Sequence, residues 1–422
     1  MKVSSPHSRS LLLCDLTQSY SPNGGGGVST YLREKRNYIL QETNHRLLQI
    51  VPGPQDRIVE SGRSIWAEIA ARRVKGSPNY RFITNTSKIH RVLQQFRPDL
   101  IESLCPWVLP WTAINYRRAN PQTILVAGYH TDFPNVHIER VGTSLFGSAI
   151  GRGFRSLSVD YARLTYQQFD RIYALGEDMR ATLRGYGIDH VDVIDLGVDS
   201  DLFHPRLRKP ELRSELALES HGPLLVYAGR IDNEKRADRL LEMFRLLPEA
   251  FGASLLMLGD GKLHQQLQEQ SKGLRVALPG FIGERKHLAV ALASSDIYIS
   301  AMADETFGIS VIEAQSCGLP VVGVQAGAMP ERVLPGTGLL GPVDDLSAMA
   351  RNVQTIWRSG AQRMGAQARV MVEGRYSWKN TFDALLGDVY PKAQHAALMR
   401  ARGKGGFGLP FRSPREAMRR RS

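Results

Sequence analysis

The sequence has no long apolar run. Of its 422 residues, 42% are apolar and 23% are charged, but the best apolar stretches, such as Leu224–Ala228 and Leu255–Leu258, have the length of a strand. A helix that crosses a bilayer needs about 20 apolar residues. The run Leu11–Cys14 near the N-terminus is also shorter than the roughly 7–15 residues of a signal-peptide core. We therefore expect no membrane-spanning segment and a cytoplasmic protein.

Cysteine is scarce as well. The three cysteines, Cys14, Cys105 and Cys317, lie far apart in the chain and have no paired spacing. Disulfide frameworks and zinc sites need cysteines in pairs or close clusters. The pattern therefore indicates neither, and we expect each thiol to behave as a small buried side chain.

Acidic residues are fewer than basic residues in this sequence. Lys and Arg number 54 against 41 Asp and Glu, which gives a net charge of +13, and the excess lies in residues 1–200 and in the last 22 residues. Such a balance suggests an anionic partner. A basic nucleic-acid-binding protein is therefore one alternative. No recognition motif for nucleic acid accompanies the charge, so we expect no specific nucleic acid as a partner.

Short apolar runs alternate with helical patterns along the chain. The runs are Leu11–Cys14, Leu47–Val51, Ile124–Ala127, Val191–Leu196, Leu224–Ala228, Leu255–Leu258, Ile297–Ser300 and Leu319–Val322. Strands that alternate with helices are typical of parallel sheets built from βαβ units. The sequence therefore predicts an α/β fold. A charged stretch with prolines near 197–222 predicts the linker between two domains.

A glycine-rich loop, Gly24–Gly27, follows the first predicted strand. A helical pattern begins directly after it and runs through Val28, Tyr31, Leu32, Lys35 and Ile39. Glycines let a ligand approach the backbone, and the free amides at a helix start favour a phosphate. The loop alone is equally compatible with a phosphate site and with a plain surface turn.

Two cations follow the strand predicted at Leu224–Ala228. Arg230 closes this strand, and Lys235 stands five residues later, ahead of a helix that begins near Ala237. Open α/β sheets bind ligands at the carboxyl ends of their strands. An Arg fork and a Lys point charge suit a diphosphate. A solvated basic loop is the alternative explanation.

Two carboxylates flank the start of a later helix. Glu305 and Glu313 are eight residues apart on either side of Phe307 and Gly308, and the helix runs to Gly318. A carboxylate at such a position is ordinarily a helix cap. Glu313 is equally compatible with a solvent-facing helical position.

Taken together, these motifs resemble glycosyltransferase family 4, also described as glycosyl transferases group 1. Residues 195–380 carry them in the order and spacing of the family, and the glycine loop with the segment 129–134 adds two N-terminal motifs. The C-terminal positions that carry the resemblance are Arg230, Lys235, Gly259, Asp260, Gly261, Gly280, Phe281, Glu305, Glu313 and the run 317–323. The family implies the GT-B fold, in which two Rossmann-like domains face each other across a cleft.

The resemblance implies four segments. Residues 1–197 form an acceptor-side Rossmann-like domain and residues 198–375 form a Rossmann-like domain that binds the nucleotide sugar. Residues 376–400 form a helix that crosses back to the first domain. Residues 401–422 form a basic tail, whose glycines, prolines and arginines predict disorder.

The implied activity is transfer of a hexose from a UDP- or GDP-linked sugar to a hydroxyl acceptor, with retention at the anomeric carbon and with neither metal nor cofactor. The implied catalytic positions are His130, Arg230, Lys235 and Glu305. The implied donor-binding positions are Gly25, Gly26, Gly259, Asp260, Phe281, Ile282, Phe307, Gly308, Ile309 and Glu313. In this scheme the cations and the loop amides oppose charge on the leaving diphosphate. Glu313 binds the ribose, Glu305 and His130 lie beside the sugar, and the leaving phosphate helps to deprotonate the acceptor.

The chain departs from the family at two positions. Arg236 stands where a glycine usually follows the lysine, and Thr306 stands where a glycine usually follows the first glutamate. The predicted phosphate contacts are unaffected by these changes. The selectivity for the donor sugar is not predicted by the motifs.

The acceptor is predicted only by class. Many family members receive a lipid-linked acceptor at an anionic membrane, so we expect a lipid or a growing saccharide chain as acceptor and peripheral association with the inner face of the membrane. The segment 144–169 interleaves apolar residues with Arg152 and Arg155, a pattern compatible with a basic amphipathic surface and equally with a core-packed helix. A sugar-nucleotide epimerase on the same fold is a further alternative, but it needs additional acid and base residues that the sequence does not show.

Overall fold

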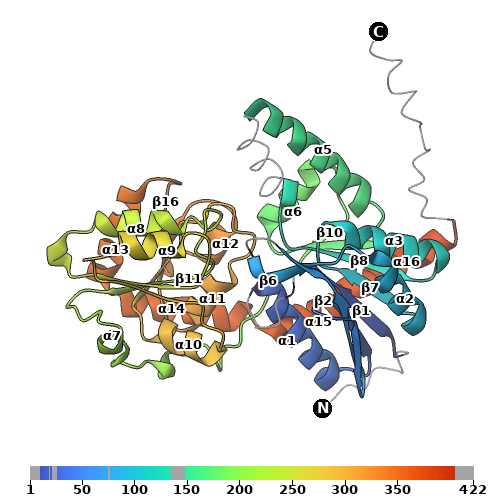
Figure 1. The fold of residues 1–422 in the computed structure, drawn as a ribbon, viewed down its shortest axis with the longest axis horizontal. Helices are drawn as coiled ribbons and strands as arrows, with labels where there is room; N and C mark the ends of the chain where they lie inside the picture. Colours follow the sequence, from blue (N-terminus) through green and yellow to red (C-terminus); the bar gives the residue numbers. More distant parts are fainter. Residues whose placement is uncertain (1–9, 19, 21–25, 75–76, 135–147, 404–422) are drawn as a thin grey trace, which may run out of the picture.

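The computed structural model describes residues 10–18, 20, 26–74, 77–134 and 148–403 (Figure 1). Its two large sheets consist mostly of parallel strands, and helices lie on their faces. Within these residues the N-terminal lobe holds an eight-stranded sheet and the C-terminal lobe a six-stranded sheet. The predicted α/β class is therefore confirmed.

The N-terminal sheet has the strand order β10-β9-β8-β7-β1-β2-β4-β3. Its pairs are parallel except for β3 and β4, which are antiparallel. Its strands are β1 (Leu12–Leu16), β2 (Arg46–Gly53), β3 (Arg57–Ser61), β4 (Ser64–Ala70), β7 (Leu100–Ser103), β8 (Ile124–Tyr129), β9 (Arg171–Ala174) and β10 (Val191–Val193). The short strands β5 (Arg72–Val74) and β6 (Ser77–Phe82) form a separate antiparallel pair.

Helices connect these strands and cover the sheet. They are α1 (Gly27–Glu42), α2 (Thr86–Phe96), α3 (Val108–Ala119), α5 (Ser148–Tyr166) and α6 (Glu177–Gly185). The helix α1 begins where the glycine loop predicts it and buries Tyr31, Leu32 and Ile39. The helix α5, in green, rises away from the sheet (Figure 1).

The C-terminal sheet has the strand order β13-β12-β11-β14-β15-β16, and all of its pairs are parallel. Its strands are β11 (Leu224–Ala228), β12 (Ser254–Leu258), β13 (Val276–Gly280), β14 (Ile297–Ile299), β15 (Val321–Val324) and β16 (Gly338–Gly341). The strand order reverses between β11 and β14. In open α/β sheets a ligand binds at this reversal, beyond the carboxyl ends of the strands.

The C-terminal lobe has its own set of helices. They are η2 (Pro205–Leu207), α7 (Leu212–Glu215), α8 (Ala237–Arg245), η3 (Glu249–Phe251), α9 (His264–Gln270), α10 (Arg285–Ala293), α11 (Ile309–Ser316), α12 (Met329–Arg332), α13 (Leu346–Ser359) and α14 (Ala361–Arg375). Apolar side chains of α8 and α13 pack on one face of the sheet, where both helices contribute to one buried cluster.

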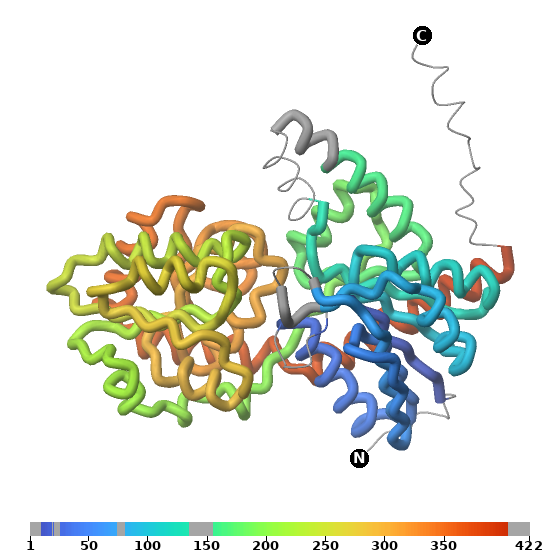
Figure 2. Tube along the Cα trace, viewed as in Figure 1, coloured from blue at the N-terminus to red at the C-terminus, as the bar shows by residue number. Residues whose placement is uncertain are grey.

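The chain passes between the lobes at two adjacent points, one in green and one in orange-red (Figure 2). Val198 forms an isolated parallel bridge with Ser377, and a Cβ atom on Gly197 would lie 2.1 Å from the nitrogen of Trp378. After this crossing, α15 (Trp378–Ala384), the π-helical turn η4 (Leu385–Val389) and α16 (Tyr390–Ala401) pack on the N-terminal lobe. The domain boundaries themselves stay a prediction, and residues 404–422 of the tail lie outside the described residues.

The buried core includes all three cysteines, as the sequence predicts. Burial raises the pKa of the Cys105 thiol to about 12, so this thiol is protonated at neutral pH. Within the described residues, no helix combines the length and the apolar character needed to cross a membrane.

Candidate active site

Four strand ends of the C-terminal sheet bring most of the predicted site residues to one edge. Arg230 follows β11, Asp260 follows β12, Phe281 follows β13, and Glu305 lies in the loop after β14. Since β11 and β14 flank the reversal of strand order, the loops that carry Arg230 and Glu305 lie where such sheets bind ligands.

The loop after β11 is held by Asp232. One carboxylate oxygen of Asp232 accepts a hydrogen bond from the backbone N–H of Lys235 at 2.9 Å, and the other pairs with the guanidinium of Arg230. Arg230 also lies 2.7 Å from Glu234, and 46% of its side chain is exposed. The Arg230 guanidinium is therefore held in place by carboxylates while its side chain is still accessible from solvent.

Lys235 and Glu305 form an ion pair across the strand reversal. Nζ of Lys235 lies 3.0 Å from Oε2 of Glu305, and the side chains are 23% and 13% exposed. Oε1 of Glu305 accepts the N–H of Gly308 at 3.1 Å, at the start of α11. Gly308 has a φ of 83°, which glycine adopts without steric cost. Glu305 thus caps the start of α11, as is ordinary for a carboxylate at this position, and it also contacts Lys235.

Glu313 lies inside the lobe rather than on its surface. Its side chain is buried on α11, and Oε1 accepts a hydrogen bond from Nη2 of Arg285 on α10 at 2.8 Å. The alternative of a solvent-facing Glu313 is therefore wrong, because α11 turns this face toward α10. The guanidinium of Arg285 also stacks on Phe203, 4.8 Å from the ring centroid.

The loop after β12 needs its glycines. A Cβ atom on Gly259 would lie 1.8 Å from the carbonyl oxygen of Gly229, and one on Gly261 would lie 2.4 Å from that of Ile231. The loops after β11 and β12 therefore pack backbone against backbone. Asp260, between the two glycines, is exposed and accepts the N–H of Gly261.

The loop after β13 presents an apolar surface. Phe281 is 45% exposed and Ile282 is half-buried. Phe307 is different, because its side chain is buried and its ring lies 4.1 Å from the guanidinium of Arg332. The Phe307 ring is therefore packed inside the lobe, and the role of this position in binding a donor stays a prediction.

The N-terminal lobe meets this edge at the start of α1. Gly26 has a φ of 91° and precedes the helix, and a Cβ atom on Gly27 would lie 4.0 Å from Cγ2 of Ile309. The hydroxyl of Thr306 donates to the carbonyl oxygen of His130 at 3.0 Å. The first turn of α1 therefore lies beside the first turn of α11. Gly25 lies outside the described residues.

His130 follows β8 and is half-buried. Burial lowers the pKa of its imidazole to about 4, and Lys35 contributes to the lowering, although Glu102 opposes it. Nε2 lies 3.2 Å from Oη of Tyr173, and the ring packs edge-on against Tyr31. His130 is therefore neutral at pH 7. Asp132, considered from the sequence as its orienting group, binds the hydroxyls of Tyr129 and Tyr186.

A buried charge cluster lies behind His130, and the sequence motifs did not indicate it. Nζ of Lys35 pairs with Asp15 and lies 3.1 Å from Oε2 of Glu102, with all three side chains buried. The sequence did contain one indication of buried charges. Lys35 falls on the apolar face of α1, and Asp15 and Glu102 fall within apolar strands, where an ionised side chain needs a partner.

Arg332 is a second buried cation that the sequence reasoning missed. Its guanidinium donates to the carbonyl oxygens of Phe307 at 2.9 Å and of Leu175 at 2.7 Å. Phe307 belongs to the loop after β14 and Leu175 to the N-terminal lobe. Arg332 therefore links the two lobes beside the candidate site.

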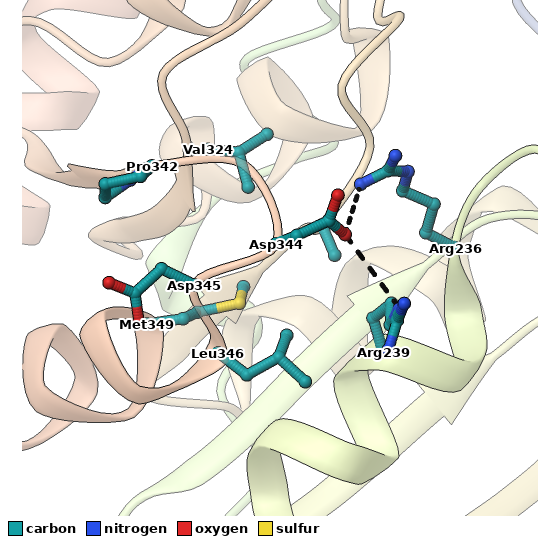
Figure 3. Close-up of a pocket in the computed structure, with 9 residues that line it drawn as sticks. Arg236, Arg239, Val324, Pro342, Asp344, Asp345, Leu346 and Met349 are labelled. Carbon is teal, nitrogen blue, oxygen red and sulfur yellow. Dashed lines mark hydrogen bonds and ion pairs between the residues drawn. The ribbon is translucent and has the colours of Figure 1, made fainter.

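Arg236 adopts a left-handed backbone with a φ of 54°. Glycine reaches this conformation without the steric cost that other residues meet, which accounts for the glycine that the motif usually has here. The Arg236 side chain binds Asp344 at 2.9 Å, beside a small hollow that Arg239 and Met349 also line (Figure 3).

Comparison with protein families matches both lobes. The model of Glycosyltransferase Family 4 matches residues 25–202, and that of Glycosyl transferases group 1 matches residues 222–359. The two matched ranges carry the glycine loop, His130, the two cations and both carboxylates of the candidate site.

Individual proteins are similar over most of the chain. A GDP-mannose-dependent alpha-mannosyltransferase of Mycobacterium tuberculosis is 31% identical over 319 residues, which cover 74% of this chain and 76% of that protein. The GDP-mannose-dependent alpha-(1-6)-phosphatidylinositol dimannoside mannosyltransferase of the same species is 26% identical over 340 residues, covering 80% and 85%. Among solved structures, sucrose-phosphate synthase from Thermosynechococcus elongatus superposes with a TM-score of 0.73 at 20% identity, covering 92% of this chain and 100% of that one.

Proposed function

Since this chain belongs to glycosyltransferase family 4 and is a glycosyltransferase that uses a nucleotide sugar, we propose that it transfers a hexose with retention to a hydroxyl of a lipid-linked acceptor. The family resemblance and the GT-B architecture predicted from the sequence are both confirmed by the comparisons. The observation that carries the finer proposal is the convergence of Arg230, Lys235 and Glu305 at the reversal of strand order in the C-terminal sheet.

The proposed donor site is built for a diphosphate. Arg230 and Lys235 supply two positive charges at the end of β11, and the first turn of α11, beginning at Ile309, supplies backbone N–H groups and the positive end of a helix dipole. As the bond from the anomeric carbon to the phosphate oxygen breaks, negative charge grows on the diphosphate. Fixed positive groups stabilise that charge without reorganising. For this reason we propose that no metal ion is required.

In this proposal the configuration at the anomeric carbon is retained, because the acceptor attacks that carbon from the same face that the phosphate leaves. The acceptor oxygen forms its bond to the anomeric carbon on that face, and its proton passes to a phosphate oxygen of the leaving group. No side-chain base is then needed. This fits the neutral state of His130, whose lowered pKa leaves it a hydrogen-bonding group beside the sugar.

We further propose that the donor is GDP-mannose and that the acceptor is an inositol lipid. Two similar mycobacterial proteins are GDP-mannose-dependent, and the name of one of them specifies a phosphatidylinositol dimannoside. Glu313 and Arg285 lie in the C-terminal lobe, where the nucleoside of the donor would bind.

Membrane association of the acceptor-side lobe is part of this proposal. On α5, Leu157 and Leu164 are 67% and 55% exposed, and their spacing of seven positions, about two helical turns, places both on one helix face. Arg155 and Arg163 lie on the same helix. Exposed leucines on a helix that also carries arginines suit an anionic membrane surface. Residues 144–147, at the start of the segment 144–169, lie outside the described residues.

A panel of nucleotide sugars tests the proposed function. Without acceptor, the protein should slowly release nucleotide diphosphate and free sugar from one donor, and GDP-mannose is the donor that we expect. Lys235→Ala is the matched inactive control. An epimerase would instead convert the donor to an isomeric nucleotide sugar, and a nucleic-acid-binding protein would leave every donor intact.

A further inference from the structure

The carboxylate of Glu102 has four hydrogen-bond donors. Oε1 accepts the hydroxyls of Tyr31 at 2.7 Å and Tyr173 at 2.9 Å. Oε2 accepts the hydroxyl of Tyr390 at 2.5 Å and the ammonium of Lys35 at 3.1 Å. An ionised carboxylate has about four acceptor sites, so this one is filled. A proton on Glu102 would displace one of the four donors, and the arrangement therefore fits the ionised form.

Burial on its own would raise the pKa of Glu102, but the charge of Lys35 and the hydroxyls of Tyr390 and Tyr31 outweigh it and lower the pKa. For Asp15, the other partner of Lys35, burial outweighs the lysine and raises the pKa. The opposite shifts make Glu102 the more acidic of the two carboxyl groups, and Glu102 is the one next to Tyr173.

The Tyr173 hydroxyl has a single proton, and three acceptors lie within reach of it. The charged Glu102 lies at 2.9 Å, and the neutral imidazole of His130 and the hydroxyl oxygen of Tyr31 each lie at 3.2 Å. Hydrogen bonds to a charged acceptor are roughly twice as strong as neutral ones. The proton therefore goes to Glu102, and the Tyr173 oxygen is left to accept a hydrogen bond from Nε2–H of His130.

Gly128 on β8 makes this contact sterically feasible. A Cβ atom at that position would lie 2.5 Å from Oη of Tyr173 and 2.7 Å from Nε2 of His130. Any side chain at position 128 would therefore occupy the place where the hydroxyl and the imidazole meet. Gly128 does not have a positive φ, so its backbone does not require glycine.

We propose that Tyr173, supported by Glu102, is a positioning residue that holds His130 as the neutral Nε2–H tautomer and leaves Nδ1 as a hydrogen-bond acceptor. The consequence for sugar transfer rests on the proposed function, in which His130 lies beside the donor sugar. An imidazole fixed in one tautomer presents an acceptor to a sugar hydroxyl without having to reorganise, whereas a mixture of tautomers presents a donor part of the time.

Nitrogen NMR of the full-length chain with labelled histidine tests the tautomer directly. His130→Gln assigns the His130 signals. We expect protonated Nε2 and unprotonated Nδ1 between pH 6 and 8. An Nδ1–H tautomer, or an imidazolium in this range, overturns the proposal, and this result needs neither activity nor a second variant.

Tyr173→Phe and Tyr390→Phe form a matched pair, because each removes one buried hydroxyl from the same carboxylate and only the first touches His130. We expect Tyr173→Phe to mix the tautomers and to lower kcat by roughly 10- to 100-fold, with KM for the donor changed by less than about threefold. Tyr390→Phe should keep the tautomer and most of kcat.

Equal losses of kcat in the two variants, or an unchanged tautomer in Tyr173→Phe, would overturn the positioning role. If no nucleotide sugar is turned over by the wild-type protein, the proposed function fails, while the NMR signals still decide for or against the tautomer.

Discussion

The Lys235 ammonium and the Glu305 carboxylate lie 3.0 Å apart, although 70 residues separate them in the chain. They come from the loops after β11 and β14, on either side of the reversal of strand order. In the proposed function, the donor diphosphate and its sugar bind next to this pair. The pair therefore makes the most direct mutational test of the donor site.

We predict that Lys235→Ala and Glu305→Ala each lower sugar transfer by at least about 100-fold, because each removes a fixed charge beside the reacting bond. Neither side chain is a core residue, so the free energy of unfolding should change by less than about 2 kcal/mol. Turnover and denaturant unfolding measure the two effects. Lys272→Ala, at an exposed lysine of the same lobe, is the control. Turnover close to wild type in either site variant would contradict the assignment.

We predict that sugar transfer survives chelation. Arg230, Lys235 and the N–H groups at the start of α11 supply the positive groups that a metal ion would otherwise supply. Initial rates measured before and after EDTA treatment should agree within about twofold. A complete loss of activity that Mg²⁺ restores would be incompatible with this donor site.

We predict that the protein binds anionic liposomes at low salt through α5. Leu157→Glu combined with Leu164→Glu should weaken co-sedimentation by at least about tenfold, because each change removes an apolar contact and adds a charge of the wrong sign. Both leucines are exposed, so folding should be unaffected. Val370→Glu is the matched control, since Val370 is 69% exposed on the C-terminal lobe. If the wild-type protein stays in the supernatant when the anionic liposomes are sedimented, the proposed membrane association is wrong.

We predict that His130 makes the fold less stable in mild acid. Burial lowers the pKa of His130 from 6.5 to about 4, so the unfolded chain takes up a proton that the folded chain does not. The resulting stability is fully present above pH 6.5 and is lost as the pH falls toward 4. At pH 5 the loss should be about 2 kcal/mol.

Urea unfolding of wild type and His130→Gln at pH 8 and pH 5 measures this loss. The wild type should lose more unfolding free energy than the variant, because the other histidines contribute equally to both. Identical losses would show that the imidazole titrates normally in the folded state.

The sequence predicts those strands and helices best whose formation depends on residues that are neighbours in the chain. Strands such as β11 and β12 are continuous apolar runs, because the sheet buries both of their faces. Several strands were not predicted, and β3 and β16 are two of them. All five residues of β3 are exposed at the sheet edge, and β16 is two leucines between two glycines.

The buried charge cluster behind His130 could not be predicted from neighbouring residues in the sequence, because its members lie far apart in the chain. Lys35 and Glu102 are 67 residues apart, and Tyr390 is 288 residues from Glu102. Only the packing of α1 and α16 on the same sheet brings them together. A lysine on an apolar helix face indicates that a partner exists, but the sequence alone does not say which residue it is.

The proposed function requires that the enzyme transfers a sugar from a nucleotide diphosphate sugar with retention at the anomeric carbon. Its most direct test is the anomeric configuration of the product, measured by proton NMR in the first minutes of transfer with the donor that the panel identifies. We predict that the product keeps the configuration of the donor, so that an α-linked nucleotide sugar gives an α-linked product. A product of inverted configuration would contradict the account.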